Sequence, residues 1–223
     1  MRYLAVGLAV VLGLSACAAP KDEVPRPEVA PSVSLPADPK AALAVGSGKA
    51  GTQSVRVGYR FTGSPTYEVK YTAVVDAAGT TWEATGDSWV LRRVRDDVWV
   101  KVTKPDELGA VPESQINTWV KAPLNYLDQT SFKGGFPWNA PRTAAETGTG
   151  ITAAGDRTYT GRLRDESFTL SLDEAGRFTR ATAGDFLEMT FSDFGTPVAV
   201  EPPPAGEVSP GPPVFLPAHV GIM

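Results

Sequence analysis

The stretch Ser54-Val-Arg-Val-Gly-Tyr-Arg-Phe61, followed by Tyr67-Glu-Val-Lys-Tyr-Thr-Ala-Val-Val75, decides the fold of this chain. In both segments the apolar side chains occupy every second position, with mostly polar residues or glycine between them. A period of two is typical of an antiparallel strand that buries one face. The two segments therefore predict two strands of a half-buried sheet.

Seven more segments of the same kind follow this pair. Those strands are expected at 80–85, 88–94, 98–103, 158–163, 168–172, 177–183 and 186–191. Turn sequences separate them, and Asp76-Ala-Ala-Gly79 resembles Asp173-Glu-Ala-Gly176, each with Gly where a hairpin turn becomes left-handed. Nine short strands joined by tight turns predict an antiparallel meander and a mainly β (α+β) fold.

A short helix is predicted at 39–45, before the first strand. The segment is rich in Ala, Asp38 is suited to the N-cap, and Pro39 is suited to the first helical position. Gly46 is expected to end this helix.

Helical spacing of apolar residues also predicts helix over 113–128, where Pro123 should cause a break or separate two short helices. The chain between Asp128 and Arg157 is rich in Gly, Thr and Ala. A long irregular connection is expected there, and such connections are often functional or disordered.

The N-terminus has the organisation of an export signal. Leu4–Leu14 is an apolar run that would span about 16 Å as a helix, half of a ~30 Å hydrocarbon core, which is too short for a membrane span. Its length suits the apolar region of a signal peptide. Leu14-Ser-Ala-Cys17 then resembles the bacterial lipobox, which implies a signal peptide over 1–16 and lipidation, including palmitate, on Cys17. An ordinary cleaved signal peptide with an incidental cysteine is the alternative.

Proline content divides the remainder of the chain. A Pro-rich disordered stalk is expected at 17–39, a β domain at 40–200 and a Pro-rich irregular tail at 201–223. Since two or more acyl chains hold a protein stably on a bilayer, a lipidated Cys17 predicts attachment to the cell membrane on its extracytoplasmic face.

Several of these segments together resemble the LolA/LolB superfamily and, within it, the LppX/LprG-type lipoproteins of actinobacteria. The resemblance rests on Cys17 before a Pro-rich stalk and on the segments 54–61, 87–94, 97–102, 168–178 and 189–203. It implies a single curved antiparallel sheet, a LolA-like half barrel, with a few short helices covering the concave face. Members of that family bind acylated molecules in the hollow between sheet and helices.

Aromatic side chains are the candidate ligand contacts under this resemblance. Those expected to line the cavity are Tyr59, Phe61, Tyr71, Trp82, Trp89, Trp99, Trp119 and Phe168. Phe132, Phe136 and Trp138, close to two glycines in the long connection, are candidates for a lid. The alternatives are ordinary core packing for the first set and a loose surface loop for the second.

Composition excludes several other classes of function. One Cys forms no intramolecular disulfide, one His and one Cys make no zinc site, and a net charge of −4 argues against a nucleic-acid partner. The chain has no catalytic motif, so we expect no enzyme, no cofactor and no metal. Two hypotheses remain: a carrier or binder of acyl lipid or another apolar molecule, and a protein-interaction or envelope-sensor module on the same fold.

Overall fold

A computed structural model describes residues 31–64, 67–104, 113–129 and 132–209 of the chain. The predicted signal peptide, Cys17, the first part of the predicted stalk and the tail beyond residue 209 lie outside these residues. The described ranges include the predicted β domain, 40–200, apart from three short internal segments.

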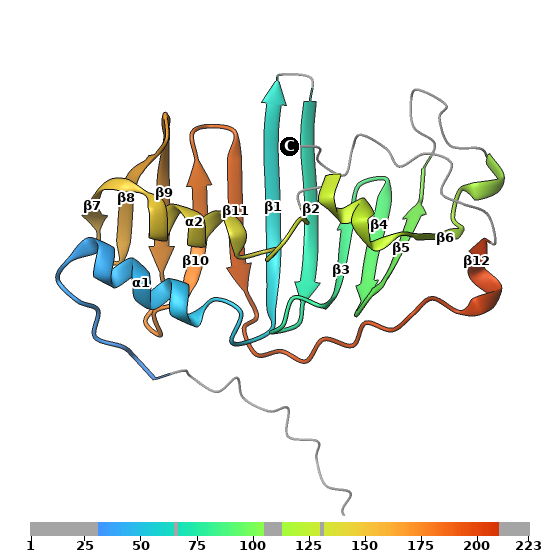
Figure 1. The fold of residues 1–223 in the computed structure, drawn as a ribbon, viewed down its shortest axis with the longest axis horizontal. Helices are drawn as coiled ribbons and strands as arrows, with labels where there is room; N and C mark the ends of the chain where they lie inside the picture. The colour runs from blue at the N-terminus through green and yellow to red at the C-terminus, as the bar shows by residue number, and fades with distance from the viewer. Residues whose placement is uncertain (1–30, 65–66, 105–112, 130–131, 210–223) are drawn as a thin grey trace, which may run out of the picture.

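One open sheet dominates the structure (Figure 1), and its strands follow the order β12-β6-β5-β4-β3-β2-β1-β11-β10-β9-β8-β7. Neighbouring strands are antiparallel, except that β12 runs parallel to β6. The strands are β1 Val55–Ser64, β2 Tyr67–Val75, β3 Thr81–Gly86, β4 Trp89–Val94, β5 Asp97–Val102, β6 Trp119–Ala122, β7 Thr149–Gly155, β8 Thr158–Leu163, β9 Glu166–Leu172, β10 Phe178–Ala183, β11 Leu187–Ser192 and β12 Val208–Ser209.

The first strand lies near the middle of this sheet and joins its two halves. Val57 on β1 is opposite Ala73 on β2 and opposite Phe191 on β11. From β1 the chain continues strand by strand along one half, β2 to β6, while β11 back to β7 form the other half. All nine predicted strands are present, so the predicted meander and the mainly β class are confirmed.

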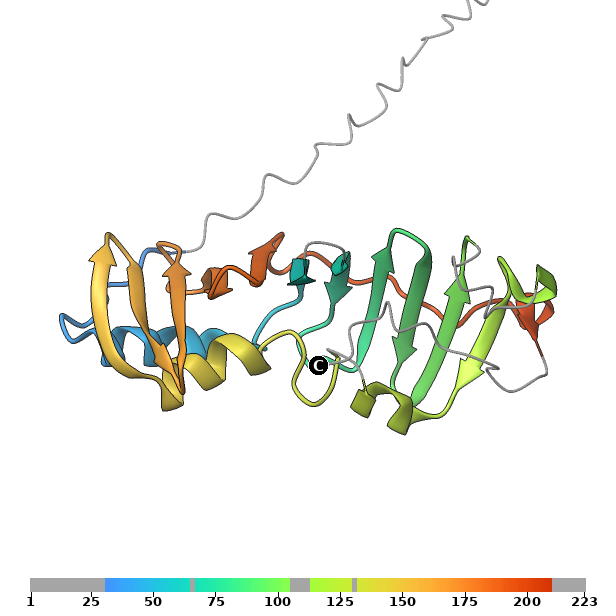
Figure 2. The same cartoon turned by 90° about the horizontal axis from the view of Figure 1, so that it is seen from above.

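Two layers make up the domain. Figure 2 shows the strands of both flanks bending toward the side that carries α1 (Pro39–Lys49), α2 (Asn139–Thr147) and the 3-10 helix η2 (Leu124–Gln129). Two other 3-10 turns are η1 (Glu113–Gln115) and η3 (Ala205–Glu207). The predicted half barrel, with few helices on its concave face, is confirmed.

Alternate strand residues meet the helices and form the core. On β1 these are Val55, Val57 and Tyr59, and on β2 they are Val69, Tyr71, Ala73 and Val75, all buried. The residues between them, such as Arg56, Arg60 and Lys70, are exposed. The helix side of the sheet is therefore apolar and the opposite side polar, as the alternation predicts.

The first helix begins as predicted and ends later. The Asp38 side chain accepts a hydrogen bond of 2.7 Å from the Ala41 backbone amide, and Pro39 is in the first turn. The helix continues through Gly46, because this glycine serves packing. A Cβ atom there would lie 2.7 Å from Leu172 Cδ2 and 2.9 Å from the Phe178 ring.

The two similar turns are confirmed as the same hairpin chemistry. Gly79 and Gly176 have φ of 70° and 77°, in the left-handed region that glycine adopts without strain. In each turn the leading aspartate accepts a backbone amide four residues on, from Thr80 and from Arg177, both at 2.8 Å.

The helix predicted over 113–128 is wrong. This segment forms η1, then strand β6, then η2. Trp119 and Val120 pair with Lys101 and Val100 of β5, so the sheet edge overrides the helical spacing. Pro123 separates β6 from η2, at the position where a break was expected.

The connection expected to be irregular between Asp128 and Arg157 contains α2 and β7. Helix α2 buries Pro141, Ala144 and Ala145, and the Arg142 guanidinium donates to the Ala50 carbonyl at the end of α1. Strand β7 at the sheet edge has mainly exposed residues. Without an alternating apolar face, it has no strand signal in the sequence.

Parts of both Pro-rich segments lie against the domain. The Val33 amide donates to the Glu174 carbonyl at 2.7 Å, and Arg157 Nη2 donates to the Val33 carbonyl at 3.0 Å. In the C-terminal segment Pro203 is buried, and Val208 and Ser209 form β12 beside Trp119 and Val120. The ordered domain thus extends beyond the expected 40–200 on both sides.

Candidate functional site

Aromatic rings cover the helix side of strands β1 to β4. Together with two rings from the loop after η2 they form what we call the aromatic layer: Tyr59, Tyr71, Trp82, Trp89, Phe132 and Phe136. All six are buried. Tyr59 and Tyr71 stack with ring centroids 4.5 Å apart, and Trp89 lies 5.7 Å from Tyr71.

Two of the three predicted lid residues, Phe132 and Phe136, belong to this layer. Phe132 stacks on Trp82 at 4.8 Å and is 5.0 Å from Tyr71, while Phe136 contacts Phe132 edge-on at 4.8 Å. Phe132 and Phe136 are 3% and 4% exposed, so this loop is not a loose surface loop.

Two glycines and a helix start shape this loop. Gly134 and Gly135 have φ of 33° and 79°, and the Gly135 carbonyl accepts the Trp138 amide at 2.7 Å. Asn139 at the start of α2 donates to the Lys133 carbonyl at 3.1 Å. The turn thereby directs Phe132 and Phe136 toward the sheet.

The remaining helix-side candidates lie around the aromatic layer. Trp138, the third lid candidate, stacks on Phe191 of β11 at 4.9 Å. Phe61 is half-buried, with the Phe186 ring 6.0 Å away. Phe168 is buried in the other half of the sheet, where a Cβ on Gly148 would lie 2.6 Å from its ring. These three side chains pack within the core.

Trp99 and Trp119 do not belong with the other candidates. Along β5 the neighbours Val98 and Val100 are in the core cluster, so Trp99 between them points to the opposite side of the sheet. Trp119, opposite Lys101, also lies on that side. Trp99 was assigned to the cavity because every residue from Val98 to Val100 is apolar and alternation assigns no face there. Trp119 was assigned with the helix expected over 113–128, whereas it begins strand β6.

The C-terminal segment crosses the sheet near these two tryptophans. Arg92 lies over the Trp119 ring, 4.5 Å from its centroid, forms an ion pair with Glu83 and donates to the Glu201 carbonyl at 2.8 Å. With Pro203 buried, this explains how two large rings on the outer side of the sheet are 6% and 5% exposed.

One tyrosine of the helix layer has a raised pKa. Tyr126 of η2 is partly buried against the core, and burial raises the pKa of its hydroxyl. The group stays protonated there, because a phenolate would lose its hydration.

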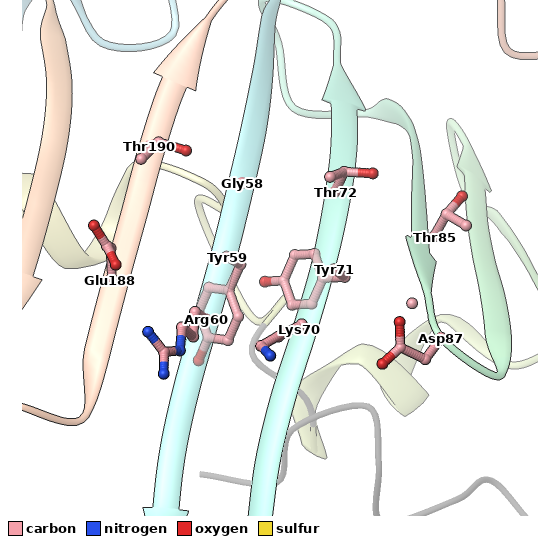
Figure 3. Close-up of a pocket in the computed structure, with 11 residues that line it drawn as sticks. Gly58, Tyr59, Arg60, Lys70, Tyr71, Thr72, Thr85, Asp87, Glu188 and Thr190 are labelled. Atoms are coloured by element: carbon pink, nitrogen blue, oxygen red, sulfur yellow. The ribbon is translucent and has the colours of Figure 1, made fainter.

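A hollow of about 590 Å³ lies on the opposite, outer side of β11, β1, β2 and β3 (Figure 3). We call it the polar hollow. The residues around it are Gly58, Tyr59, Arg60, Lys70, Tyr71, Thr72, Thr85, Gly86, Asp87, Glu188 and Thr190. Of these residues only Tyr59 and Tyr71 were singled out from the sequence, as contacts on the helix side, and no site on the outer side was predicted. The only hint of the hollow in the sequence is Gly58, a glycine that stands between Arg56 and Arg60 where the alternation would otherwise place a polar side chain.

Ion pairs border the polar hollow. Glu68 accepts from Arg60 at 2.6 Å and from Lys70 at 2.5 Å, and Glu188 pairs with Arg180 at 2.9 Å. Hydrogen bonds first from Lys70 and then from Arg60 lower the pKa of Glu68 below its ordinary value of 4.5. The Arg60–Glu68 and Arg180–Glu188 pairs join neighbouring strands, whereas Lys70 and Glu68 both lie on β2.

Two solved structures are similar to this chain in fold. One is the crystal structure of LprF from Mycobacterium bovis, with 13% identity, a TM-score of 0.47, and coverage of 77% of this chain and 99% of LprF. The other is MucB in complex with MucA(peri), with 14% identity, a TM-score of 0.33, and coverage of 84% and 62%. Neither a family model nor the sequence of a curated protein matches the chain. The half-barrel assignment is therefore based on the sheet order and on the helix layer.

Within the described ranges, no helix combines the length and the apolar character needed to cross a membrane. In the same ranges no three His, Cys, Asp or Glu side chains gather as metal ligands would. The described residues thus present two places where a ligand would find suitable chemistry, the aromatic layer and the polar hollow.

Proposed function

We propose that this chain is an extracytoplasmic lipoprotein, anchored to the membrane through Cys17, that binds an acyl lipid or another apolar molecule and catalyses no reaction. The ligand would lie between the strands β1 to β4 and the loop 132–138. Its chains would take the place of the Phe132 and Phe136 rings on the aromatic layer.

One observation carries this proposal. The helix side of β1 to β4 presents contiguous aromatic surface, and two rings of a glycine-containing loop cover it. A loop of this kind can exchange its own rings for a ligand at lower cost than a packed helix, since fewer backbone hydrogen bonds have to break.

The free energies of the two steps, displacing a ring and burying an acyl chain, support such an exchange. Removing a buried phenyl ring from a core costs about 3–5 kcal/mol. Each CH₂ that enters an apolar site contributes about 0.8 kcal/mol. About four to six methylenes would therefore offset the displacement of one ring, and ordinary acyl chains are longer than that.

The first test is native purification followed by lipid mass spectrometry. Residues 17–223 carrying Cys17→Ser would be expressed in a bacterial host and extracted without added lipid. We expect about one acyl lipid for each protein chain. Trp82→Ala should reduce the bound lipid, whereas Trp99→Ala, on the outer side of the sheet, should leave it unchanged. A stably folded, empty protein would overturn the proposal.

The anchor is tested separately in cells that express the whole chain. Mass spectrometry of the membrane fraction should find an N-terminal peptide that begins at an acylated Cys17. Cys17→Ser should move the protein out of that fraction. An unmodified Cys17, with unchanged membrane association, would contradict the anchor without affecting the ligand proposal.

The alternative function is a protein-interaction or envelope-sensor module. The ring-on-ring packing of Phe132, Trp82 and Tyr71 favours it, because a filled interior needs no ligand. Cross-linking of the anchored protein in intact membranes, followed by peptide mass spectrometry, tests this alternative. A single reproducible protein partner together with an empty interior would support it.

A further inference from the structure

We propose that the polar hollow on the outer side of β11, β1, β2 and β3 is a second binding site, which takes a neutral sugar. This site lies on the other side of the same strands from the aromatic layer, and Tyr59 and Tyr71 are the two residues that belong to both. It does not depend on lipid binding.

The site is an open hollow whose size suits a small ligand. Its volume of about 590 Å³ is within the usual range of roughly 300–1,000 Å³ for ligand sites. A second hollow of about 210 Å³ shares Arg60 and Glu188 with it and continues toward Thr182 of β10. Together the two hollows extend over five strands, β10 to β3, and we refer to the pair as the groove.

At the centre of the groove, strand β1 carries no side chain on the outer side, because the residue there is Gly58. Gly58 on β1 is opposite Thr190 on β11 and opposite Thr72 on β2. A Cβ atom on Gly58 would lie 2.5 Å from Thr190 Oγ1, closer than such atoms approach. Glycine therefore lets the threonine side chain lie over the strand and leaves the space above β1 open.

Three hydroxyl groups stand in a row across the groove. Thr190, Thr72 and Thr85 are exposed side chains, and Thr72 is opposite Thr85 in the register of β2 and β3. Among the described residues the structure records no hydrogen bond of these hydroxyls. A hydroxyl both donates and accepts, which matches the hydroxyl groups of a sugar.

Charged groups of both signs flank the hydroxyl row (Figure 3). Arg60 and Lys70, which are paired with Glu68, carry further N–H donors, and Asp87 and Glu188 carry acceptor oxygens, although Glu188 is also paired with Arg180. Two positive and two negative side chains leave the lining without net charge. A phosphate or carboxylate ligand would face Asp87 and Glu188, whereas a neutral molecule with several hydroxyls can use both kinds of group.

The test uses residues 17–223 with Cys17→Ser, labelled with ¹⁵N. Backbone amide spectra are recorded during titration with maltotetraose, cellotetraose and chitotetraose. At least one of these sugars should change the chemical shifts of the backbone amides of Gly58, Thr72 and Thr190. Thr72→Trp, which fills the groove from an exposed position, should weaken that binding at least about tenfold. Thr72→Val should weaken it about fivefold through the lost hydroxyl.

Ser192→Trp is the matched control. Ser192 is exposed on the same side of β11 and lines neither hollow. This variant should bind as the unsubstituted chain does. Equal urea midpoints for the two Trp variants would show that Thr72→Trp acts on binding rather than on folding.

A second arm distinguishes a free glycan from a lipid headgroup. Vesicles of phosphatidylcholine with and without monogalactosyl diacylglycerol replace the soluble sugars. Retention only by the galactolipid vesicles, lost in Thr72→Trp, would support a headgroup site. The proposal is overturned if neither the sugars nor the galactolipid bind, if Thr72→Trp binds as tightly as the parent, or if only inorganic phosphate or an anionic heparin tetrasaccharide binds.

Discussion

Trp82 of β3 and Phe132 of the loop before α2 stack face to face, with ring centroids 4.8 Å apart and 14° between their planes. Trp82 is 1% exposed and Phe132 3%. The contact joins the middle of the sheet to the segment that covers it, without a helix between them. Under the proposed function, an acyl ligand would reach the aromatic surface of the sheet where this stack opens.

Removing the Phe132 ring should reveal what the stack contributes. Phe132→Ala is expected to lower the free energy of unfolding by about 3–5 kcal/mol, as for other buried aromatic rings. It should also let an apolar fluorescent probe bind at the vacated space. Urea unfolding followed by tryptophan fluorescence measures the first effect, and probe titration the second.

Leu124→Ala provides the comparison for that experiment. Leu124 lies in η2 and is 40% exposed, so its truncation should cost less than about 1 kcal/mol. If the two variants lost equal stability, the ring stack would not be a principal contact of this half of the domain.

Two glycines of α1 should respond in opposite directions to alanine. At Gly46 a Cβ would lie 2.7 Å from Leu172 Cδ2, so Gly46→Ala should cost about 1–3 kcal/mol through crowding. At Gly48 nothing lies within 4 Å, so Gly48→Ala should add about 0.5–1 kcal/mol through helix propensity. Urea midpoints compare the two, and a more stable Gly46→Ala would refute the close packing of α1.

Arg92 should hold the C-terminal segment against the sheet. It stacks on Trp119 and donates to the Glu201 carbonyl, and a hydrogen bond from a charged group contributes about 1.5–3 kcal/mol. Arg92→Ala should therefore accelerate amide exchange over 205–209 by about tenfold or more, measured by mass spectrometry.

Arg93→Ala is the control on the same strand. Arg93 donates to the Arg95 carbonyl within its own hairpin and not to the C-terminal segment. Its replacement should leave exchange over 205–209 unchanged. Fast exchange in the unsubstituted protein would mean that Arg92 does not retain the segment.

Glu68 should make stability depend on acid pH. Its folded pKa is lowered from the ordinary 4.5, so the ionised carboxylate stabilises the fold above that pH, and this contribution is lost as the pH falls through the lowered pKa. The effect should be small and salt-sensitive, since the pairs are exposed. NMR titration should give a midpoint below 4.5 for Glu68, and Glu68→Gln should flatten the acid side of the stability profile.

Glu174→Gln is the matched control for this titration. Glu174 is an exposed glutamate for which the structure records no ion pair with a described residue. Glu174→Gln should leave the acid side of the stability profile unchanged. An unshifted Glu68 midpoint would show that Arg60 and Lys70 do not hold the carboxylate in solution.

Local sequence pattern determined the strands of this protein. Alternation at 54–61 and 67–75, and the Asp and Gly of two turns, are properties of adjacent residues, so they could be read without knowing the fold. The same pattern indicated which residues of β1 and β2 would be buried. It failed where the pattern was missing, as in exposed β7, or ambiguous, as in the segment around Trp119.

Tertiary structure alone decided where the candidate ligand sites lie. Trp99 belongs to the outer side of the sheet because Val98 and Val100 meet the helix side, and Phe132 reaches Trp82 only because the loop returns across the sheet. The polar hollow needs Gly58 beside Thr190, which are brought together by the pairing of β1 with β11. Strand propensity acts between neighbours in the chain, whereas pairing partners and the side that a loop covers depend on contacts between residues far apart in it.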